Sequence, residues 1–498
     1  MIELYDLYVT KMKRIADLNY SSAVLQWDQE VNMPPKGAGF RAQQLATLAG
    51  LSHEFSTEKE LGELLEQLHG SRMLSIKETA NVLESLRVFR QNKKYTTDFV
   101  VELNKTVSES FVAWQEAKAK NDFSVFKPKL QALIDLKRQE CEILGYDEHP
   151  YDAMLNLYEP GLKTSFMSAL FADVREKLVP YVTDILRKPQ PESNFLFTHF
   201  DKGKQWHFGL ELLRQMQYDF EGGRQDVSTH PFTTNFSASD VRVTTRINEN
   251  DLFEMIGSCI HEGGHALYEQ GLPVEDYGLP SGEYLSLSIH ESQSRLWENM
   301  VGRSFAYWKC NYPRLQEIFP EQLKGISVEK FYKGINTVKP SLIRTNADEL
   351  TYHFHVMIRF EIERDILSGK LNADDLPLAW NAKYKEYLGI DIPSDSKGVL
   401  QDVHWSHGSF GYFPTYSLGS FYASQFFHFA GNEIQDLKHQ IEEGNLTPLL
   451  MWLRDKIHKH GRTVLSDELC KNITGEVLNF DYFFNYAKEK YDALYKGE

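Results

Sequence analysis

The sequence predicts a mainly α-helical protein with one small β-sheet. Most of the 498 residues follow helical periodicity, with apolar residues recurring every three or four positions. One segment, 228–248, is instead rich in Thr, Val and Phe, with apolar and polar residues alternating around 241–247. No internal repeat, low-complexity tract or linker-like run divides the chain. We therefore expect one large helical domain over residues 1–498, with a small sheet beside the helix that follows it.

The composition excludes several classes of protein. A formal net charge of -16 argues against nucleic acid or an anionic membrane as the main partner, since both normally require a basic surface. No apolar run approaches membrane-spanning length, and the N-terminus lacks signal-peptide character, so we expect a cytoplasmic protein. The four cysteines lack C-x-x-C spacing, which indicates reduced, mostly buried thiols rather than disulfides or a thiolate metal site.

The apolar pattern also predicts individual helices. A helix over 57–69 is expected to begin at Thr57, because Glu60 follows at capping-box spacing. Longer helical patterns cover roughly 76–119, 250–270 and 283–308.

Residues 257–271, GSCIHEGGHALYEQG, contain the spacing H-E-x-x-H on the predicted helix 250–270. His261 and His265 lie one turn apart on one face, so both imidazoles can reach a single zinc ion. Glu262, rotated by about 100° around the helix, can reach a metal-bound water as a general base. The alternative is a coincidence of spacing, which arises in roughly a few per cent of chains this long.

A third ligand candidate, Glu291, lies on the predicted helix 283–308. His/His/Glu sites built from two helices are a standard arrangement for catalytic zinc, with one position left open for water. His290 beside it could support the metal ligands or face a substrate. His353 and His355 are two positions apart on a helix and point away from each other, so we expect no shared ion there.

Two adjacent glycines, Gly263 and Gly264, occupy the middle of the H-E-x-x-H helix, where each costs roughly 1 kcal/mol relative to alanine. Two explanations for these glycines are possible. In the first, another backbone or a substrate strand approaches the metal closely at this point; in the second, the helix packs tightly against a neighbouring helix. Residue spacing alone leaves both explanations open.

Six further motifs accompany H-E-x-x-H, in the order WDQEVNMPP (27–35), HPF (230–232), DVRVT (240–244), HESQ (290–293), IRTNAD (343–348) and GVLQDVHW (398–405). With them, the chain resembles the thermostable metallocarboxypeptidases of the carboxypeptidase Taq type over nearly its full length. The resemblance implies a helical, saddle-like fold with a deep groove, similar to peptidases of the neurolysin and angiotensin-converting type. The N-terminal helices, about 1–120, could then form a lid, and the catalytic part would span about 225–425.

The resemblance also implies the activity and its metal site. It implies a homodimer with one Zn²⁺ per subunit, for which Co²⁺ can substitute, bound by His261, His265 and Glu291, with Glu262 as the catalytic base. The substrates would be peptides with a free C-terminus, cleaved one residue at a time with broad specificity. A zinc oligoendopeptidase with the same fold, or a non-catalytic peptide-binding protein, are the rival functions.

Two sets of polar residues are expected to assist this chemistry. The segment HWSHGSFGYFPTY supplies His404, His407, Tyr412 and Tyr416, of which a tyrosine and a histidine are expected to stabilise the transition state. Ordinary aromatic packing is the alternative role for these four residues.

A carboxypeptidase must also bind the free carboxylate of its substrate, and arginine is suited to this because its fork donates to both oxygens. The resemblance points to Arg344 and Arg242 for this role, with an ion pair to Asp348 or Asp240 as the alternative. In the same motifs, His230, Asp240 and Gln401 are further substrate-binding candidates. We expect the 228–248 segment to close one end of the groove, because it carries Arg242 next to the metal helix.

Overall fold

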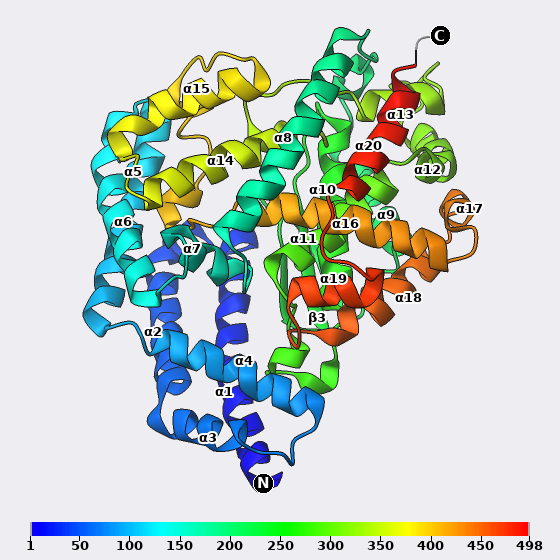
Figure 1. Cartoon of the computed structure of the whole chain (residues 1–498). Helices are drawn as coiled ribbons and strands as arrows, with labels where there is room; N and C mark the ends of the chain where they lie inside the picture. The colour runs from blue at the N-terminus through cyan, green and yellow to red at the C-terminus, as the bar shows by residue number, and fades with distance from the viewer. Residues whose placement is uncertain (1, 497–498) are drawn as a thin grey trace. The chain divides into compact units, whose positions relative to one another are not determined.

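Helices make up most of the chain in the computed structural model, which describes residues 2–496 (Figure 1). A single three-stranded sheet accompanies them among the described residues. The mainly helical class and the small sheet are therefore confirmed.

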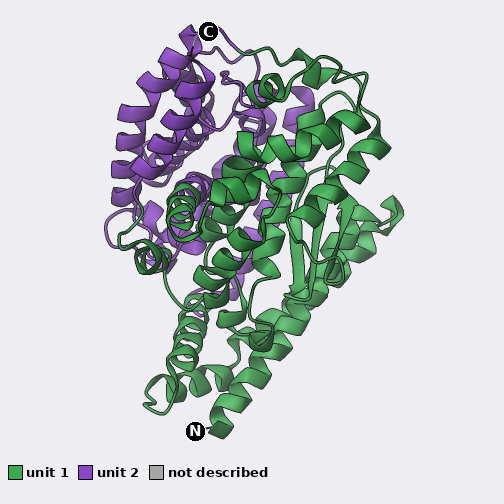
Figure 2. Ribbon diagram, turned by 90° about the vertical axis from the view of Figure 1, so that its right-hand side faces the viewer, with its two compact units in different colours: residues 1–92, 191–335, 422–478 green, residues 93–190, 336–421, 479–498 purple. Residues whose placement is uncertain are grey.

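The residues form two compact units, each built from three segments of the chain (Figure 2). Unit 1 comprises residues 1–92, 191–335 and 422–478, and unit 2 comprises residues 93–190, 336–421 and 479–498. The helices of unit 1 are α1 (Ile2–Val31), α2 (Ala38–Thr57), α3 (Lys59–His69), α4 (Ile76–Asn92), α9 (Lys202–Gln215), α10 (Leu252–Glu269), α11 (Leu287–Arg295), α12 (Phe305–Ile318), α13 (Val328–Ile335), α17 (Leu437–Glu442), α18 (Thr447–Lys456) and α19 (Ser466–Thr474). Those of unit 2 are α5 (Thr97–Lys120), α6 (Phe123–Leu144), α7 (Pro150–Tyr158), α8 (Thr164–Arg187), α14 (Tyr352–Leu367), α15 (Leu376–Leu388) and α20 (Asp481–Leu494), while α16 (Pro414–Glu433) begins in unit 2 and ends in unit 1.

The sheet of unit 1 has the strand order β1-β3-β2, formed by β1 (Gly223–Val227), β2 (Thr233–Ser237) and β3 (Asp240–Thr245). The central strand β3 pairs in parallel with β1 and antiparallel with β2. Val241 and Val243 are buried on the face that packs against α10, whereas the side chain of Arg242 lies on the other face. The alternation around 241–247 thus predicted the central strand, although β1 lies outside the predicted segment.

Helix α10 is held in the core of unit 1 by its cap and its apolar face. The carboxylate of Asp251 caps its first turn by accepting from the backbone N–H groups of Phe253 and Glu254. Behind the first turn, Met255, Ile256 and other apolar side chains of α10 are fully buried. This helix therefore presents the H-E-x-x-H residues from a fixed position between α9, α11 and the sheet.

Both central glycines of α10 are explained by helix packing. A Cβ at Gly264 would lie 2.7 Å from the Cα of Ser294 on α11, and one at Gly263 would lie 2.8 Å from Leu213 on α9. The neighbour at Gly264 is backbone, which cannot move aside as a flexible side chain can. Of the two explanations left open by spacing, close helix packing is therefore correct.

Two predicted helix boundaries are wrong. Thr57 ends α2 instead of capping α3, because its hydroxyl donates to the carbonyl of His53 and the extended residue Glu58 separates the two helices. The predicted helix 76–119 is two helices, because the side chain of Thr96 caps a new helix at Thr97. In both places a local polar group interrupts an apolar pattern that continues beyond it.

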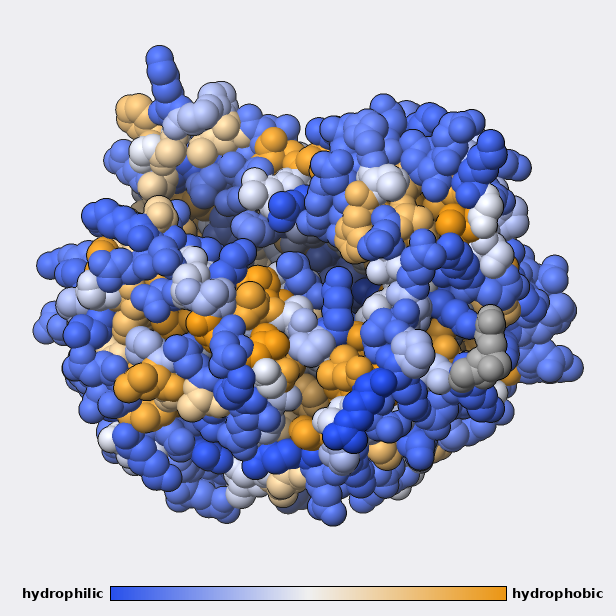
Figure 3. Space-filling model, turned by 90° about the horizontal axis from the view of Figure 1, so that it is seen from above, coloured by the Kyte–Doolittle hydropathy of each residue, from blue (hydrophilic) through white to orange (hydrophobic). Residues whose placement is uncertain are grey.

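Hydrophilic residues cover most of the face shown in Figure 3, with hydrophobic residues in small groups between them. Within residues 2–496, every helix is too short or too polar to cross a membrane.

We expect Gly264→Ala to lower the free energy of unfolding by about 1–3 kcal/mol, because the added methyl group forces α10 away from α11. Gly257→Ala on the same helix is the matched control. Its Cβ would meet only the ring of Phe253, at 3.6 Å, and alanine favours the helix by up to about 1 kcal/mol. Urea denaturation of the metal-free variants measures both effects, and equal stability of the two variants would contradict this packing account.

Candidate metal centre

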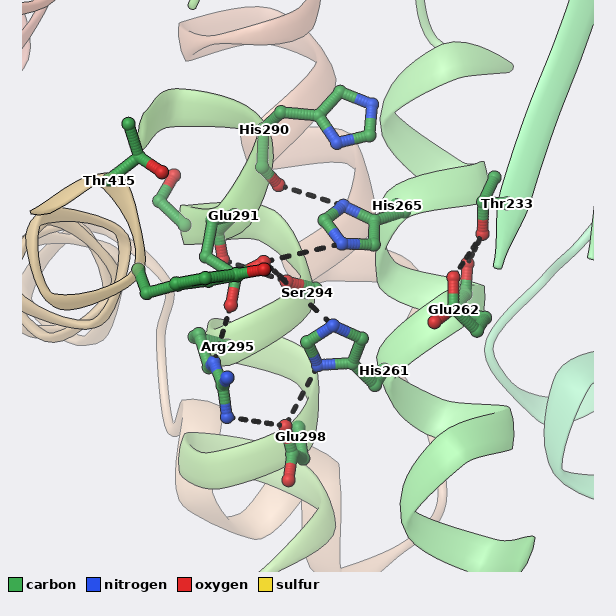
Figure 4. Close-up of polar contacts among 12 residues, drawn as sticks. Thr233, His261, Glu262, His265, His290, Glu291, Ser294, Arg295, Glu298 and Thr415 are labelled. Atoms are coloured by element: carbon green, nitrogen blue, oxygen red, sulfur yellow. Dashed lines mark hydrogen bonds and ion pairs between the residues drawn. The ribbon is translucent and has the colours of Figure 1, made fainter. Parts of the chain in front are cut away.

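The three predicted metal ligands lie together in unit 1, two on α10 and one on α11 (Figure 4). Their ligand atoms are all within 4.8 Å of one another. The Nε2 atom of His265 lies 3.4 Å from Oε2 of Glu291, and Nε2 of His261 lies 3.8 Å from the same oxygen. Ligand atoms bound to one tetrahedral zinc at about 2.0–2.1 Å are separated by about 3.3–3.5 Å, so the two distances to Glu291 need little adjustment for such an ion.

The hydrogen bonds of the two histidines leave their Nε2 atoms available to a metal. Nδ1 of His261 lies 2.9 Å from Oε2 of Glu298, and Nδ1 of His265 lies 3.1 Å from the carbonyl oxygen of His290. A carbonyl and an ionised carboxylate can only accept, so each Nδ1 carries the proton. The lone pair of each neutral imidazole is then on Nε2, directed toward Glu291.

The two oxygens of Glu291 have different roles, because Arg295 binds one of them. Its Nε donates to Oε1 at 2.7 Å, which leaves Oε2 facing the histidines. Burial raises the pKa of Glu291, but the Arg295 guanidinium and the two histidines lower it further, so the net pKa lies well below its usual value. The carboxylate is therefore ionised and oriented as a one-oxygen metal ligand.

Glu298 supports the centre from a π-helical segment, Leu296–Gly302, that continues α11. Besides His261, its carboxylate contacts Arg295 at 3.1 Å and Arg303 at 3.4 Å. We did not predict this residue from the sequence. Its signal was the spacing of Glu291, Arg295 and Glu298 at intervals of four and three, which places all three on one helix face.

Glu262 lies on the side of α10 that faces β2, away from the three ligands (Figure 4). The hydroxyl of Thr233 contacts both its carboxylate, at 2.7 Å, and its backbone carbonyl, at 2.9 Å. Burial raises the pKa of Glu262 above its usual value, so this carboxylate is a stronger base than one in water. Thr233 has no motif of its own, and only the position of β2 beside α10 reveals its contact.

His290 contacts the metal ligand His265 and supports its position. Its Nε2 lies 2.8 Å from Oε1 of Glu269, whose other oxygen accepts from the amide of Asn235 at 2.7 Å. The ring of His290 also stacks on that of His265, with centroids 4.4 Å apart. Of its two possible roles, contact with the metal ligands is the one observed.

Arg344 belongs to a buried ionic cluster in unit 2. Its Nε donates to Oδ1 of Asp402 at 3.1 Å, and its Nη1 donates to the hydroxyl of Tyr352 at 2.9 Å. The fully buried Arg359 donates to the other oxygen of Asp402 at 2.7 Å. One carboxylate thus serves two guanidinium groups, which leaves a net positive charge in a largely buried environment. An anion would compensate that charge.

The expected alternative partner of Arg344 is wrong. Asp348 instead accepts from Thr351 and from the backbone N–H of Lys339. Gln401, predicted to bind substrate, holds this part of the chain together: its Oε1 accepts from the backbone N–H of Arg344 and from Arg359.

The four donor candidates of the 404–416 segment separate into two groups. His404 lies 3.2 Å from the Tyr416 hydroxyl through Nε2, and the ring of Tyr412 packs against both of these residues. Burial, together with the nearby Arg344, lowers the pKa of His404 to about 3, so its imidazole is neutral. His407 is exposed and packs on Phe111, so it does not join the other three.

Arg242 has a full ion pair of its own. Its Nε and Nη2 atoms donate to the two oxygens of Asp240, each at 2.9 Å, and its guanidinium lies over the rings of Trp27 and Phe236. The alternative role weighed for Arg242, an ion pair with Asp240, is therefore present. His230 is exposed, and its described contact is made by its carbonyl, which accepts from Ser228.

Comparisons with known proteins all point to one family. Residues 8–491 match the carboxypeptidase Taq (M32) metallopeptidase family. The chain is 39% identical to carboxypeptidase 1 of Bacillus subtilis over 99% of its own length and 98% of the relative, and 40% identical to thermostable carboxypeptidase 1 of Thermus thermophilus over 95% of each. The crystal structure of an M32 carboxypeptidase from Deinococcus radiodurans, 38% identical, superposes with a TM-score of 0.97 over 99% of both chains.

We expect zinc affinity to fall with acidification, because a proton and the metal compete for Nε2 of His261. Burial lowers the pKa of His261, but the carboxylates of Glu291 and Glu298 raise it further, to a net value above its ordinary one. Affinity should therefore fall about tenfold per pH unit below that pKa. Glu298→Gln should move the onset of this fall to lower pH, because it removes one of the negative charges. Competition with a chromophoric chelator between pH 5.5 and 8 measures this, and an affinity independent of pH would contradict the ligand assignment.

Proposed function

The chain belongs to the carboxypeptidase Taq (M32) metallopeptidase family, and on that premise we propose that it is a zinc-dependent carboxypeptidase that removes single residues from peptides with broad specificity. The observation that carries the proposal is the convergence of His261, His265 and Glu291, with both Nδ1 atoms already bound to acceptors. Members of this family are peptide hydrolases, so the chain is an enzyme.

The donor set of two imidazoles and one carboxylate suits zinc, although cobalt also accepts these ligands. A zinc ion bound there would polarise the scissile carbonyl and lower the pKa of a bound water. In this proposal, Arg295 and Glu298 hold the ligands in place, through Oε1 of Glu291 and Nδ1 of His261.

Glu262 is the proposed general base. Its burial raises its pKa, which favours removal of a proton from water near neutral pH and return of that proton to the leaving amine. Thr233 holds the carboxylate by one hydrogen bond from its hydroxyl, which leaves the second carboxylate oxygen to accept the proton.

We propose that Tyr416 and His404 stabilise the developing oxyanion, with Tyr412 beside them. Support comes from their mutual contacts and from the lowered pKa of His404, which keeps its imidazole neutral. His407 is not proposed as a transition-state donor, because its ring lies on Phe111 at the surface.

Arg344 is the proposed receptor for the substrate carboxylate. Two guanidinium groups share the single carboxylate of Asp402, and a bound carboxylate would compensate the remaining positive charge. Arg242 is the weaker candidate, since the carboxylate of Asp240 binds it through both oxygens and already compensates its charge. In this proposal β3, the strand that carries Arg242, forms part of the wall that closes one end of the groove. The packing of β2 and β3 directly against α10 supports this.

Three further parts of the proposal come from the resemblance and the composition. We propose that two copies form a homodimer and that the enzyme acts in the cytoplasm. The net charge of -16 also supports peptides, rather than nucleic acids or membranes, as its partners.

Stepwise loss of C-terminal residues is expected from a peptide offered as a free acid but not from the same peptide offered as an amide. Glu262→Gln should slow this release by about 10²–10⁴-fold without weakening zinc binding, because Glu262 is a base rather than a ligand. Mass spectrometry of the digests, with a chelator titration alongside, measures both. Internal cuts in both peptides would instead indicate an endopeptidase.

Arg344→Ala is expected to reduce kcat/KM for free-acid peptides by about 10- to 100-fold, the loss expected for hydrogen bonds between charged groups. Asp402 keeps its ion pair with Arg359 in this variant, so the fold should be retained. Arg242→Ala is the comparison, because it removes a guanidinium that already has a full partner. A larger loss of the preference for acids over amides in Arg242→Ala would reverse the two assignments.

A further inference from the structure

A buried carboxylate on α14, that of Glu363, accepts three hydrogen bonds that converge on it from other parts of unit 2. Its Oε1 accepts from the indole Nε1 of Trp405 at 2.8 Å. Its Oε2 accepts from the hydroxyl of Tyr151 at 2.6 Å and from the backbone N–H of Gly411 at 2.9 Å. The side chain is completely buried, so water cannot replace a lost partner.

Two of the three donors belong to one loop, residues 404–413, which we call the His404 loop. Trp405 lies near its start, directly after His404, and Gly411 lies near its end, directly before Tyr412. Gly411 has a φ of +91°, and a Cβ there would lie 2.6 Å from the backbone of Met154 on α7. The loop is thus bound to α14 at both ends through a single carboxylate.

The charge of this carboxylate matters because only an ionised carboxylate accepts at both oxygens without a competing proton. Burial raises the pKa of Glu363 to about 7, although its three donors and the charge of Arg359 lower it in part. The phenols of Tyr151 and Tyr158 also face it, and burial raises the pKa of both. Stability alone would favour an apolar residue at this position, since the buried charge has no directly bonded cation.

We propose that Glu363 is a positioning residue for the reaction, whose ionised carboxylate fixes both ends of the His404 loop and thereby the placement of His404, Tyr412 and Tyr416. The inference rests on the proposed function, in which these three residues act on the transition state. Glu363 acts on the three through its hydrogen bonds to Trp405 and Gly411.

Hydrogen–deuterium exchange of the zinc-loaded enzyme tests the contact without using activity. In Glu363→Gln the amide nitrogen must face Trp405 or the other two donors, so at least one hydrogen bond is lost. Exchange in the peptides that cover 404–413 should then rise at least tenfold, while α10 is unchanged. Tyr151→Phe is the matched control: it also removes one bond to Glu363, but leaves both contacts to the loop, and loop exchange should change less than twofold.

Kinetics test the consequence for the reaction. Glu363→Gln should lower kcat at pH 8 at least tenfold with less than a twofold change in KM, because the loop that carries the transition-state donors is loosened while substrate binding is not. Trp405→Phe, which loses one loop contact, should lower kcat in the same direction if Glu363→Gln fails to fold.

Unchanged loop exchange in both Glu363→Gln and Trp405→Phe would overturn the proposal, as would increased exchange with an unchanged kcat. A wild-type enzyme that releases no C-terminal residues would instead refute the proposed function, whatever the exchange data show.

Discussion

The close approach of α10 to α11 is the constraint on which the metal centre depends. Gly264 allows it, since any side chain there would meet the backbone of α11 at Ser294. At this separation Oε2 of Glu291 lies 3.4 Å from Nε2 of His265, and the carbonyl of His290 reaches the Nδ1 of the same histidine. The two glycines weaken the helix by about 1 kcal/mol each, and this cost is offset where the packed helices bury their apolar faces.

The two ionic clusters differ in how far their buried charges are compensated. At the metal centre, Glu291 and Glu298 are paired with Arg295, so the ligand oxygen is ionised and oriented before any metal binds. In unit 2, Asp402 is shared by Arg344 and Arg359, so positive charge remains. Buried charge without full compensation rarely favours folding, and such places are where binding and catalysis are found. The positive charge that remains in the second cluster is the observation that supports the proposed carboxylate site there.

Most of the fold class and the core of the metal site could be predicted, because both depend on short-range periodicity. Helical spacing places His261 and His265 on one face whatever surrounds them, and the β-rich pattern near 241–247 predicted β3. Helix boundaries were predicted less well, since single residues such as Thr96 decide them. The roles of Arg344 and of the 404–416 segment came from the family resemblance, as no spacing rule connects them to the metal ligands.

By itself, the sequence determined the candidate metal ligands His261, His265 and Glu291 and the face of α10 that presents the two histidines. Only the tertiary structure decided what holds those residues: Thr233 meets Glu262 across 29 positions of the chain, Asp402 meets Arg344 across 58, and Trp405 meets Glu363 across 42. Only the structure could separate His407 from His404 and replace Asp348 with Asp402 as the partner of Arg344. The physical reason is that helix periodicity is a local property, whereas a hydrogen bond between distant segments depends on the packing of every element between them.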